Sequence, residues 1–219
     1  MSLKALPTQT RALKKRRDLL DAALLEFVDK GFDATTAKSI AERAGVATGT
    51  FYQYFNNKDE MLLLVARERF AEVHANVRLP GIEQVDQRSG HVDIAAFFQQ
   101  VLSWIYDFHA RDSRLHEVLE YRRSVDAALN EEMHKGEAIL LERARQLVHA
   151  FGCANPEAVA FCLFAMAEGI VHRHVFHPQA LSKAEVVETG AQMLSAYFET
   201  LKSSDEIGEQ LKHKAPGAQ

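Results

Sequence analysis

The chain contains little cysteine and no long apolar run. Cys153 and Cys162 are its only cysteines among 219 residues. Both lie in apolar, helix-like contexts, so we expect reduced, buried thiols of a cytoplasmic protein rather than a disulfide framework. No stretch approaches the roughly 18 uninterrupted apolar residues of a membrane span. The basic N-terminus also lacks the apolar core of a signal peptide. We therefore expect no membrane partner.

The short motifs of common catalytic and metal sites are also absent. The sequence has no HExxH, no cysteine pair at zinc spacing, no Gly-rich phosphate loop and no nucleophile elbow. Ten histidines invite a metal interpretation, and His172, His174 and His177 lie close together. On a helix, however, His172 and His174 point about 200° apart, so the three would not converge on one tetrahedral ion. The sequence thus predicts no catalytic residue, no metal site and no cofactor.

No segment alternates with a period of two, and no hairpin turn signal occurs, so we predict an all-α fold of about nine helices. A weakly patterned stretch from Leu79 to Gly90 predicts a loop after the fourth helix. A polar tail is expected from about Ser203. The predicted helices cover residues 10–30, two short segments within 35–58, and then 58–79, 91–110, 114–123, 126–151, 156–177 and 183–202.

The segment from Thr35 to Lys58 is the most informative part of the chain. Its first half predicts a short helix with one narrow apolar face, formed by Ala37, Ile40, Ala41 and Ala44. Thr36 is a candidate N-cap, but Ser39 stands where a capping box has Glu or Gln, so we expect that box to be incomplete. Gly45 stands where a helix end favours a left-handed residue.

The second half predicts a helix with two contrasting sides. Phe51 and Phe55 lie on the apolar side, which is continuous with Val46 and Ala47. At about 100° per residue, the opposite side carries small or hydrogen-bonding groups: Thr48, Gly49, Tyr52 and Gln53. A helix that enters the DNA major groove needs this division.

Charge is distributed unevenly along the chain. The net charge is −4, yet residues 1–17 contain six Lys or Arg and no acid, which leaves −10 for the remainder. A basic segment attached to an acidic body concentrates the attraction for phosphate at one end. The alternative is a merely solvated N-terminal arm.

These features resemble the DNA-binding domain of the TetR/AcrR family of transcriptional regulators. The resemblance implies a helix-turn-helix domain over residues 1–57, an effector-binding and dimerisation domain over 58–204, and a polar tail over 205–219. It is carried by Gly31-Phe32-Asp33-Ala34-Thr35-Thr36, Ile40-Ala41, Ala44-Gly45-Val46, Gly49-Thr50-Phe51-Tyr52, Tyr54-Phe55 and Lys58-Asp59-Glu60-Met61-Leu62.

The resemblance also implies which residues contact double-stranded operator DNA. Tyr54 and Lys58 match positions that commonly touch phosphates, and Thr36 could donate to phosphate as well. Base edges are within reach of Lys38, Thr48 and Gln53, since Gln pairs well with adenine and Lys with guanine. Gly49 permits close approach of the backbone. The predicted surface is completed by Thr50 and Tyr52.

In this family the fifth to seventh helices enclose an effector pocket, and the last two helices pair in a homodimer. The expected effector is a small, partly apolar molecule. Most of the candidate pocket residues are as consistent with core or surface positions as with ligand binding. They are Phe98, Trp104, Phe108, His109, Tyr121, Arg122, Glu168 and His172.

The resemblance therefore implies a ligand-responsive dimeric regulator, acting by repression, that binds palindromic operator DNA and is released by its effector. Two alternatives from other classes stay open. One is a helical protein-interaction module whose helix-turn-helix no longer binds DNA. The other is an enzyme that uses the histidine-rich half without binding DNA.

Overall fold

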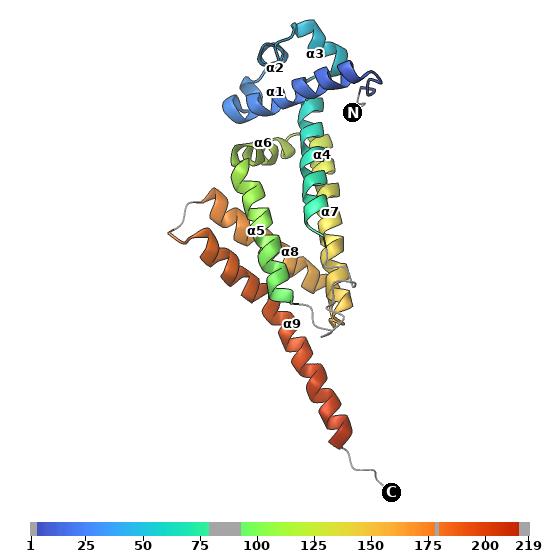
Figure 1. Cartoon of the computed structure of the whole chain (residues 1–219), viewed down its shortest axis with the longest axis vertical. Coiled ribbons are helices and arrows are strands. Elements are labelled where there is room, and N and C mark those ends of the chain that lie inside the picture. The colour runs from blue at the N-terminus through green and yellow to red at the C-terminus, as the bar shows by residue number, and fades with distance from the viewer. Residues whose placement is uncertain (1–3, 79–92, 178–179, 215–219) are drawn as a thin grey trace. The chain divides into compact units, whose positions relative to one another are not determined.

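The computed structural model describes residues 4–78, 93–177 and 180–214, with side chains described up to residue 200. These residues form nine helices and no strand, which confirms the all-α prediction (Figure 1). The predicted loop from Leu79 to Gly90 lies outside the described residues. The helices are α1 Thr10–Ala34, α2 Ala37–Arg43, α3 Thr48–Tyr54, α4 Lys58–Asn76, α5 Ile94–Arg111, α6 Ser113–Arg123, α7 Ala127–Ala150, α8 Pro156–Phe176 and α9 Lys183–Lys214.

The helices divide between two compact units. Unit 1 comprises residues 1–75 and 111–138, and unit 2 comprises residues 76–110 and 139–219. Unit 1 thus contains α1 to α4, α6 and the first half of α7. Unit 2 contains α5, the second half of α7, α8 and α9. The predicted boundary after residue 57 concerns function, and it stays a prediction.

Unit 1 is built around one apolar core to which every one of its helices contributes. Phe27 of α1, Ile40 of α2 and Phe51 of α3 are fully buried in it. Leu62 of α4 and Leu115 of α6 are buried in the same core. Arg67 of α4 is also paired with Glu132, in the first half of α7, at 2.8 Å. The first three helices therefore share one core with α4, α6 and the first half of α7.

The end of α1 depends on one glycine. Gly31 has φ 78° and ψ 168°, a conformation that is essentially reserved for glycine, and it interrupts the helix before Ala34. This interruption turns Phe32 into the core. The Thr35 hydroxyl then donates to the Gly31 carbonyl at 2.8 Å. The break predicted at Gly31 is thus confirmed.

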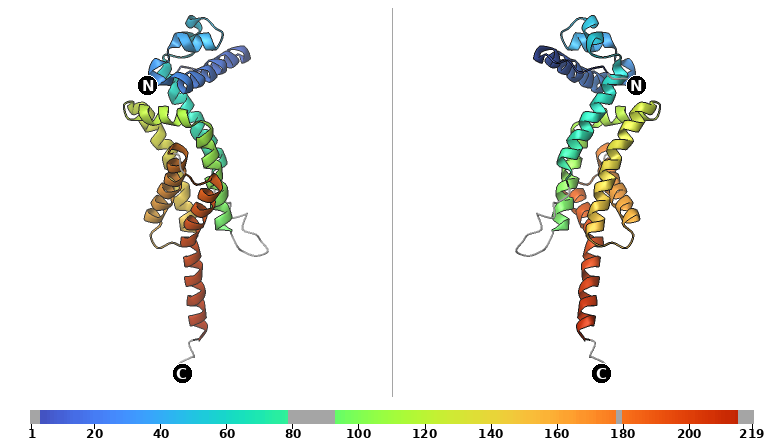
Figure 2. Two further views of the ribbon diagram at one scale, coloured as in Figure 1. Left: turned by 90° about the vertical axis from the view of Figure 1, so that its left-hand side faces the viewer. Right: turned by 90° about the vertical axis from the view of Figure 1, so that its right-hand side faces the viewer.

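Unit 2 has a second core in which α5, α8 and α9 meet. Its centre includes Leu102, Ala160 and Phe198. α8 and α9 pack against one another, and in both views of Figure 2 the C-terminal part of α9 extends past α5 and α8. By length and composition α8 could cross a membrane, the one such helix among the described residues. Only Ala160, Leu163 and Val171 of α8 are buried.

Three expectations from the sequence were wrong. Helical spacing predicts a buried stripe of Leu13, Leu20, Leu24 and Phe27 on the first helix, but Leu13 is 42% exposed, because the first turns of α1 extend beyond the core, whose first buried residue is Leu19. Cys162 is exposed, since its neighbours Ala160 and Leu163 face the core instead. Cys153 is buried as expected. Burial raises the pKa of its thiol, and a hydrogen bond with Tyr197, which acts in the opposite direction, offsets this only in part. The last helix was expected to end at about residue 202, before a polar tail, but the backbone of α9 stays helical through most of that tail, to Lys214.

Candidate nucleic-acid interface and histidine cluster

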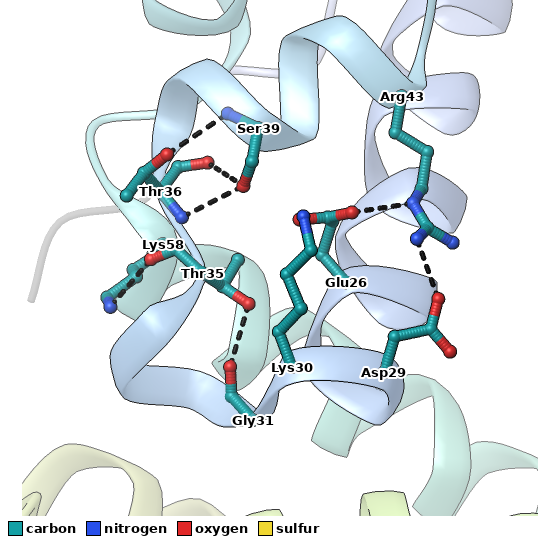
Figure 3. Close-up of polar contacts among 9 residues, drawn as sticks. All are labelled: Glu26, Asp29, Lys30, Gly31, Thr35, Thr36, Ser39, Arg43 and Lys58. Atoms are coloured by element: carbon teal, nitrogen blue, oxygen red, sulfur yellow. Dashed lines mark hydrogen bonds and ion pairs between the residues drawn. The ribbon is translucent and has the colours of Figure 1, made fainter.

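A buried carboxylate fixes α2 against α1. Glu26 of α1 is 2% exposed, and it accepts hydrogen bonds from Arg43 of α2 and from Lys30, both at 2.7 Å (Figure 3). Arg43 also donates to Asp29 at 2.6 Å. Burial alone would raise the pKa of Glu26, but hydrogen bonds from Lys30, Ser39 and Arg43 outweigh it and lower that pKa. The charged carboxylate is therefore the stable form in the folded chain.

The start of α2 carries a complete capping box, contrary to the expectation from Ser39. The Thr36 hydroxyl accepts from the Ser39 amide at 3.0 Å, and the Ser39 hydroxyl accepts from the Thr36 amide at 3.1 Å (Figure 3). A serine hydroxyl has both an acceptor and a donor, so it replaces the usual Glu or Gln and also donates to the Thr36 carbonyl at 3.0 Å. Thr36 itself stays exposed.

Gly45 makes the turn between α2 and α3. Its φ is +67°, in the left-handed region. The Val46 amide donates to the Ala41 carbonyl at 2.9 Å, and the Gly45 amide donates to the Glu42 carbonyl at 3.1 Å. Both bonds satisfy carbonyls at the end of α2. The predicted helix-turn-helix geometry is thus present within unit 1.

The two sides of α3 are as different as the sequence predicts. Phe51 and Phe55 are fully buried in the core of unit 1. On the other side Gly49, Tyr52 and Gln53 are exposed, with 53% of Tyr52 accessible. Thr48 and Thr50 are half-buried. One short helix therefore exposes to solvent the amide of Gln53, the phenol of Tyr52 and the backbone at Gly49, which has no side chain.

Lys58 occupies a different environment from the one expected of a phosphate-binding lysine. Its ammonium donates to the carbonyls of Phe32 and Thr35 at 2.7 and 2.8 Å, and lies 3.3 Å from that of Asp33. It also lies 4.4 Å from the centre of the Phe32 ring. An ammonium has three donors, and here they point at the chain between α1 and α2. Figure 3 shows the bond to Thr35.

The other predicted phosphate and base contacts differ in how exposed they are. Tyr54 is half-buried and packs against the core of unit 1. The Lys38 side chain is 75% exposed and lies 3.8 Å from Glu42. Such a pair on an exposed helix face is weak. Lys38 is therefore available to a partner at little cost.

The basic N-terminal segment is held close to α3 and α4. The Lys4 amide donates to Glu60 at 2.8 Å, and the Lys4 ammonium donates to the Tyr52 carbonyl. Glu60 is fully buried and also accepts from the Asn56 amide at 2.7 Å. Arg16 lies over the Phe55 ring at 5.0 Å. From Thr10 onward this segment is the beginning of α1, with Arg11 and Lys14 exposed.

Sequence reasoning missed the two buried glutamates that organise this surface. Glu26 lies four residues before Lys30, so a local helix pair was visible in the sequence, but Arg43 is 17 residues away. Glu60 was named only as part of the Lys58–Leu62 motif. Neither position carries a sequence signal that an acidic side chain would be buried.

The structure brings together some of the predicted effector-binding residues in unit 2. Trp104 and Phe108 of α5 stack at 5.2 Å, and Phe108 meets His109 at 5.4 Å. His109 then meets His172 of α8, with 3.3 Å between their Nε2 atoms. Glu168 lies 3.9 Å from Nδ1 of His172. These five residues form one aromatic and histidine cluster.

The remaining three predicted effector residues lie elsewhere. Phe98 is buried against Phe198 of α9, at 5.9 Å between ring centres. Tyr121 belongs to unit 1 and is 58% exposed. Arg122, also in unit 1, pairs with Asp59 at 3.0 Å and lies 4.2 Å from the centre of the Phe32 ring. The prediction of an effector site at these positions stays open.

Comparisons with known proteins point in the same direction as the geometry. Residues 19–65 match the family described as "Bacterial regulatory proteins, tetR family". The HTH-type transcriptional regulator TtgR of Pseudomonas putida is 26% identical over 204 residues, covering 85% of this chain and 94% of TtgR.

Two solved structures have a similar fold. A putative TetR-family regulator from Mesorhizobium loti has a TM-score of 0.67 at 20% identity, covering 86% of this chain and 98% of that one. The complex of SmeT with triclosan has a TM-score of 0.60 at 23% identity, covering 84% and 91%. SmeT is the repressor of a multidrug efflux pump of Stenotrophomonas maltophilia.

Proposed function

Because the chain belongs to the TetR family of transcriptional regulators, we propose that it is a ligand-responsive repressor. It binds palindromic operator DNA as a homodimer in the cytoplasm and is released by a small-molecule effector. The observation that carries this proposal is the two-sided α3, with Phe51 and Phe55 fully buried and Gly49, Tyr52 and Gln53 exposed. A groove-reading helix needs such an anchored back and polar front.

DNA binding is assigned to residues 1–57, with Lys58 at its edge. Gln53, Thr48 and Lys38 read base edges, while Gly49 lets the α3 backbone come close. Thr36, Thr50 and Tyr54 contact the sugar-phosphate backbone, and Tyr52 contacts sugar or a thymine methyl. Lys58 supports DNA binding mainly by positioning α2, since its ammonium donates to carbonyls of the segment that leads into that helix. The exposed Arg11 and Lys14 add attraction for phosphate.

Effector binding is assigned to residues 58–204. The cluster of Trp104, Phe108, His109, Glu168 and His172 combines apolar rings with a few polar atoms, which is the usual composition of a small-molecule site. SmeT, a chain of the same fold, has been seen with triclosan. A partly apolar effector fits both observations.

The homodimer is assigned to α8 and α9. Phe161 is 63% exposed and Met166 38% exposed on α8, while Met193 and Tyr197 are 58% and 38% exposed on α9. Met193 and Tyr197, four residues apart, share one face of α9, whereas Phe161 and Met166, five residues apart, point about 140° apart on α8. Apolar exposure of this extent on two adjacent helices is typical of a surface that a second copy covers. The same pairing accounts for the long apolar composition of α8.

Within unit 1, one ring connects α6 to the DNA-binding helices. The ammonium of Lys58, on α4, lies 4.4 Å from the centre of the Phe32 ring, and the guanidinium of Arg122, on α6, lies 4.2 Å from it. Arg122 also pairs with Asp59 of α4 at 3.0 Å. A shift of α6 would therefore disturb the end of α1 and the start of α4. An effector that favours one arrangement by about 1–3 kcal/mol would change operator affinity by roughly 5- to 150-fold.

A gel-shift experiment tests the proposal. The purified, ligand-free protein is incubated with duplexes from the region upstream of its own gene and with shuffled duplexes of equal composition. Retardation of the upstream duplex at protein concentrations that leave the shuffled one free would support the regulator. Equal behaviour of both duplexes would favour the protein-interaction module or the enzyme.

A further inference from the structure

Two imidazoles in unit 2 face each other through their ring nitrogens. His109 of α5 and His172 of α8 are 63 residues apart in sequence, yet their Nε2 atoms are 3.3 Å apart. Their rings are almost perpendicular, at 87°, with centres 4.5 Å apart. Two ring nitrogens that face each other in this way either share one proton or bind one cation between them.

The separation of the nitrogens matches a metal ion. Zn–N bonds are about 2.0–2.1 Å long, so two nitrogens on one tetrahedral ion lie roughly 3.3–3.4 Å apart. The observed 3.3 Å between Nε2 of His109 and Nε2 of His172 therefore has the spacing of two ligands. A hydrogen bond between the two ring nitrogens can span the same distance, so a cation and a shared proton are distinguished by a metal titration.

A carboxylate stands behind one of the two rings. Oε1 of Glu168, one turn earlier on α8, lies 3.9 Å from Nδ1 of His172. A carboxylate on that side favours the tautomer that has its proton on Nδ1, which leaves the lone pair of Nε2 directed at His109. Metal-binding histidines commonly donate this N–H to a carboxylate; at 3.9 Å, Glu168 is at ion-pair distance and would have to move closer to accept it.

The surroundings hold the rings while leaving access from solvent. The Phe176 ring lies 5.5 Å from His172 and 6.1 Å from His109, and Phe108 lies 5.4 Å from His109. The side chains of His172 and Glu168 are 28% and 45% exposed. An ion can therefore reach ligands whose orientation is restrained by aromatic neighbours.

We propose that His109 and His172 bind one divalent transition-metal ion of the zinc class through their Nε2 atoms, with Glu168 positioning His172. Imidazole suits zinc, copper and nickel, and water completes the coordination. The expectation of no metal site considered histidines that are close along one helix, whereas this pair joins two helices. The metal is titrated without DNA and the operator without metal, so each proposal can fail without the other.

The test uses the full-length, untagged protein after removal of metal with a chelator. Titration with cobalt chloride is followed by the visible d–d absorption of tetrahedral Co²⁺. We expect saturation at one equivalent, loss of the signal in His109→Ala and in His172→Ala, and full retention in His149→Ala, which removes an exposed histidine of α7. Glu168→Gln should weaken cobalt binding by about 10- to 100-fold.

Thermal unfolding without metal checks that each variant folds, and His109→Gln and His172→Gln replace any alanine variant that does not. The absence of a saturable cobalt spectrum in the unaltered protein would overturn the site. A spectrum that survives removal of both histidines would overturn it as well.

Discussion

Lys58 illustrates how one side chain can serve the DNA-binding surface without touching DNA. Its ammonium holds the carbonyls of Phe32 and Thr35, which flank the entry into α2. Hydrogen bonds from a charged donor contribute about 1.5–3 kcal/mol each when they are well formed. In unit 1 this lysine therefore supports the position of Thr36 and of the helix that follows it.

Replacement of this lysine separates support from direct contact. Lys58→Met should lower the free energy of unfolding by about 1–3 kcal/mol, because the carbonyls lose their donor. Lys38→Met removes an exposed lysine and should change stability by less than about 0.5 kcal/mol. Urea unfolding measures both. Equal stability of the two variants would show that Lys58 does not hold this segment.

Glu26 gives stability a defined dependence on pH. Its pKa is lowered in the folded chain, so the folded state gains stability above the unfolded-state pKa of about 4.3. That gain disappears as the pH falls through the lower, folded-state pKa. At pH 7, Glu26→Gln should cost about 1–3 kcal/mol. The difference from the unaltered protein should shrink below about pH 4.

Unfolding of Glu26→Gln and of the unaltered protein at several pH values checks this expectation. Glu188→Gln, at an exposed position on α9, is the matched control. A penalty for Glu26→Gln that is the same at pH 3 and pH 7 would contradict the role of the charge.

Sequence reasoning reached some residues of the site and not others, for a physical reason. The apolar positions Ile40, Phe51 and Phe55 follow from helical period, which needs only neighbours in the chain. Glu26 and Lys58 find partners 17 to 26 residues away. Periodicity has no information about such pairs, so their roles became visible only in three dimensions.

At the scale of the helices, the turn between α2 and α3 is sensitive to a single methyl group. Gly45→Ala forces a left-handed backbone, at φ +67°, onto a residue with a side chain. No described atom lies within 4 Å of the added carbon, so the cost is conformational, about 1–2 kcal/mol. We expect lower thermal stability and weaker operator binding from this variant.

Gly49→Ala should behave in the opposite sense for stability. Gly49 lies inside α3 and has open space around the added carbon, so alanine should stabilise the helix by about 0.5–1 kcal/mol. Operator affinity should nevertheless fall, because the methyl group blocks the close approach of the backbone to DNA. Calorimetry and fluorescence anisotropy on the same samples separate the two effects. Unchanged affinity would exclude Gly49 from the contact surface.

Helix positions were easier to predict than helix ends. The ends at Gly31 and Gly45 were recognised, because positive φ strongly favours glycine. The end of α9 was missed, since a polar composition does not by itself interrupt a helix. The capping box was missed because Ser39 performs a role usually given to longer side chains.

For the complete protein, the exposed apolar faces of α8 and α9 predict self-association. Phe161→Glu places a charge in the proposed dimer surface, where Phe161 is 63% exposed in the single chain. Sedimentation velocity should show a shift from dimer to monomer. Operator affinity should fall by at least about tenfold, since two half-sites are then no longer bound together.

Val125→Glu is the matched control, because Val125 is 64% exposed and lies outside α8 and α9. It should sediment like the unaltered protein. A monomeric unaltered protein, or a dimer that tolerates Phe161→Glu, would refute this interface.

The effector side was the least predictable part of the chain. Phe98 and Phe108 look alike in the sequence, yet one packs against Phe198 and the other joins the histidine cluster. The cluster depends on the meeting of α5 and α8, which are separated by two other helices in the chain. Residue types along the sequence do not predict that these two helices come into contact.

The most direct test of α3 as the DNA-reading helix is the base preference of Gln53→Ala. Fluorescence anisotropy would measure its affinity for the operator and for every single base-pair substitution, beside Gln146→Ala, which alters an exposed glutamine of α7. We expect Gln53→Ala to lose discrimination at one position of each half-site, with a loss of about 1–3 kcal/mol. Gln146→Ala should match the unaltered protein. Retention of every base preference by Gln53→Ala would contradict the assignment.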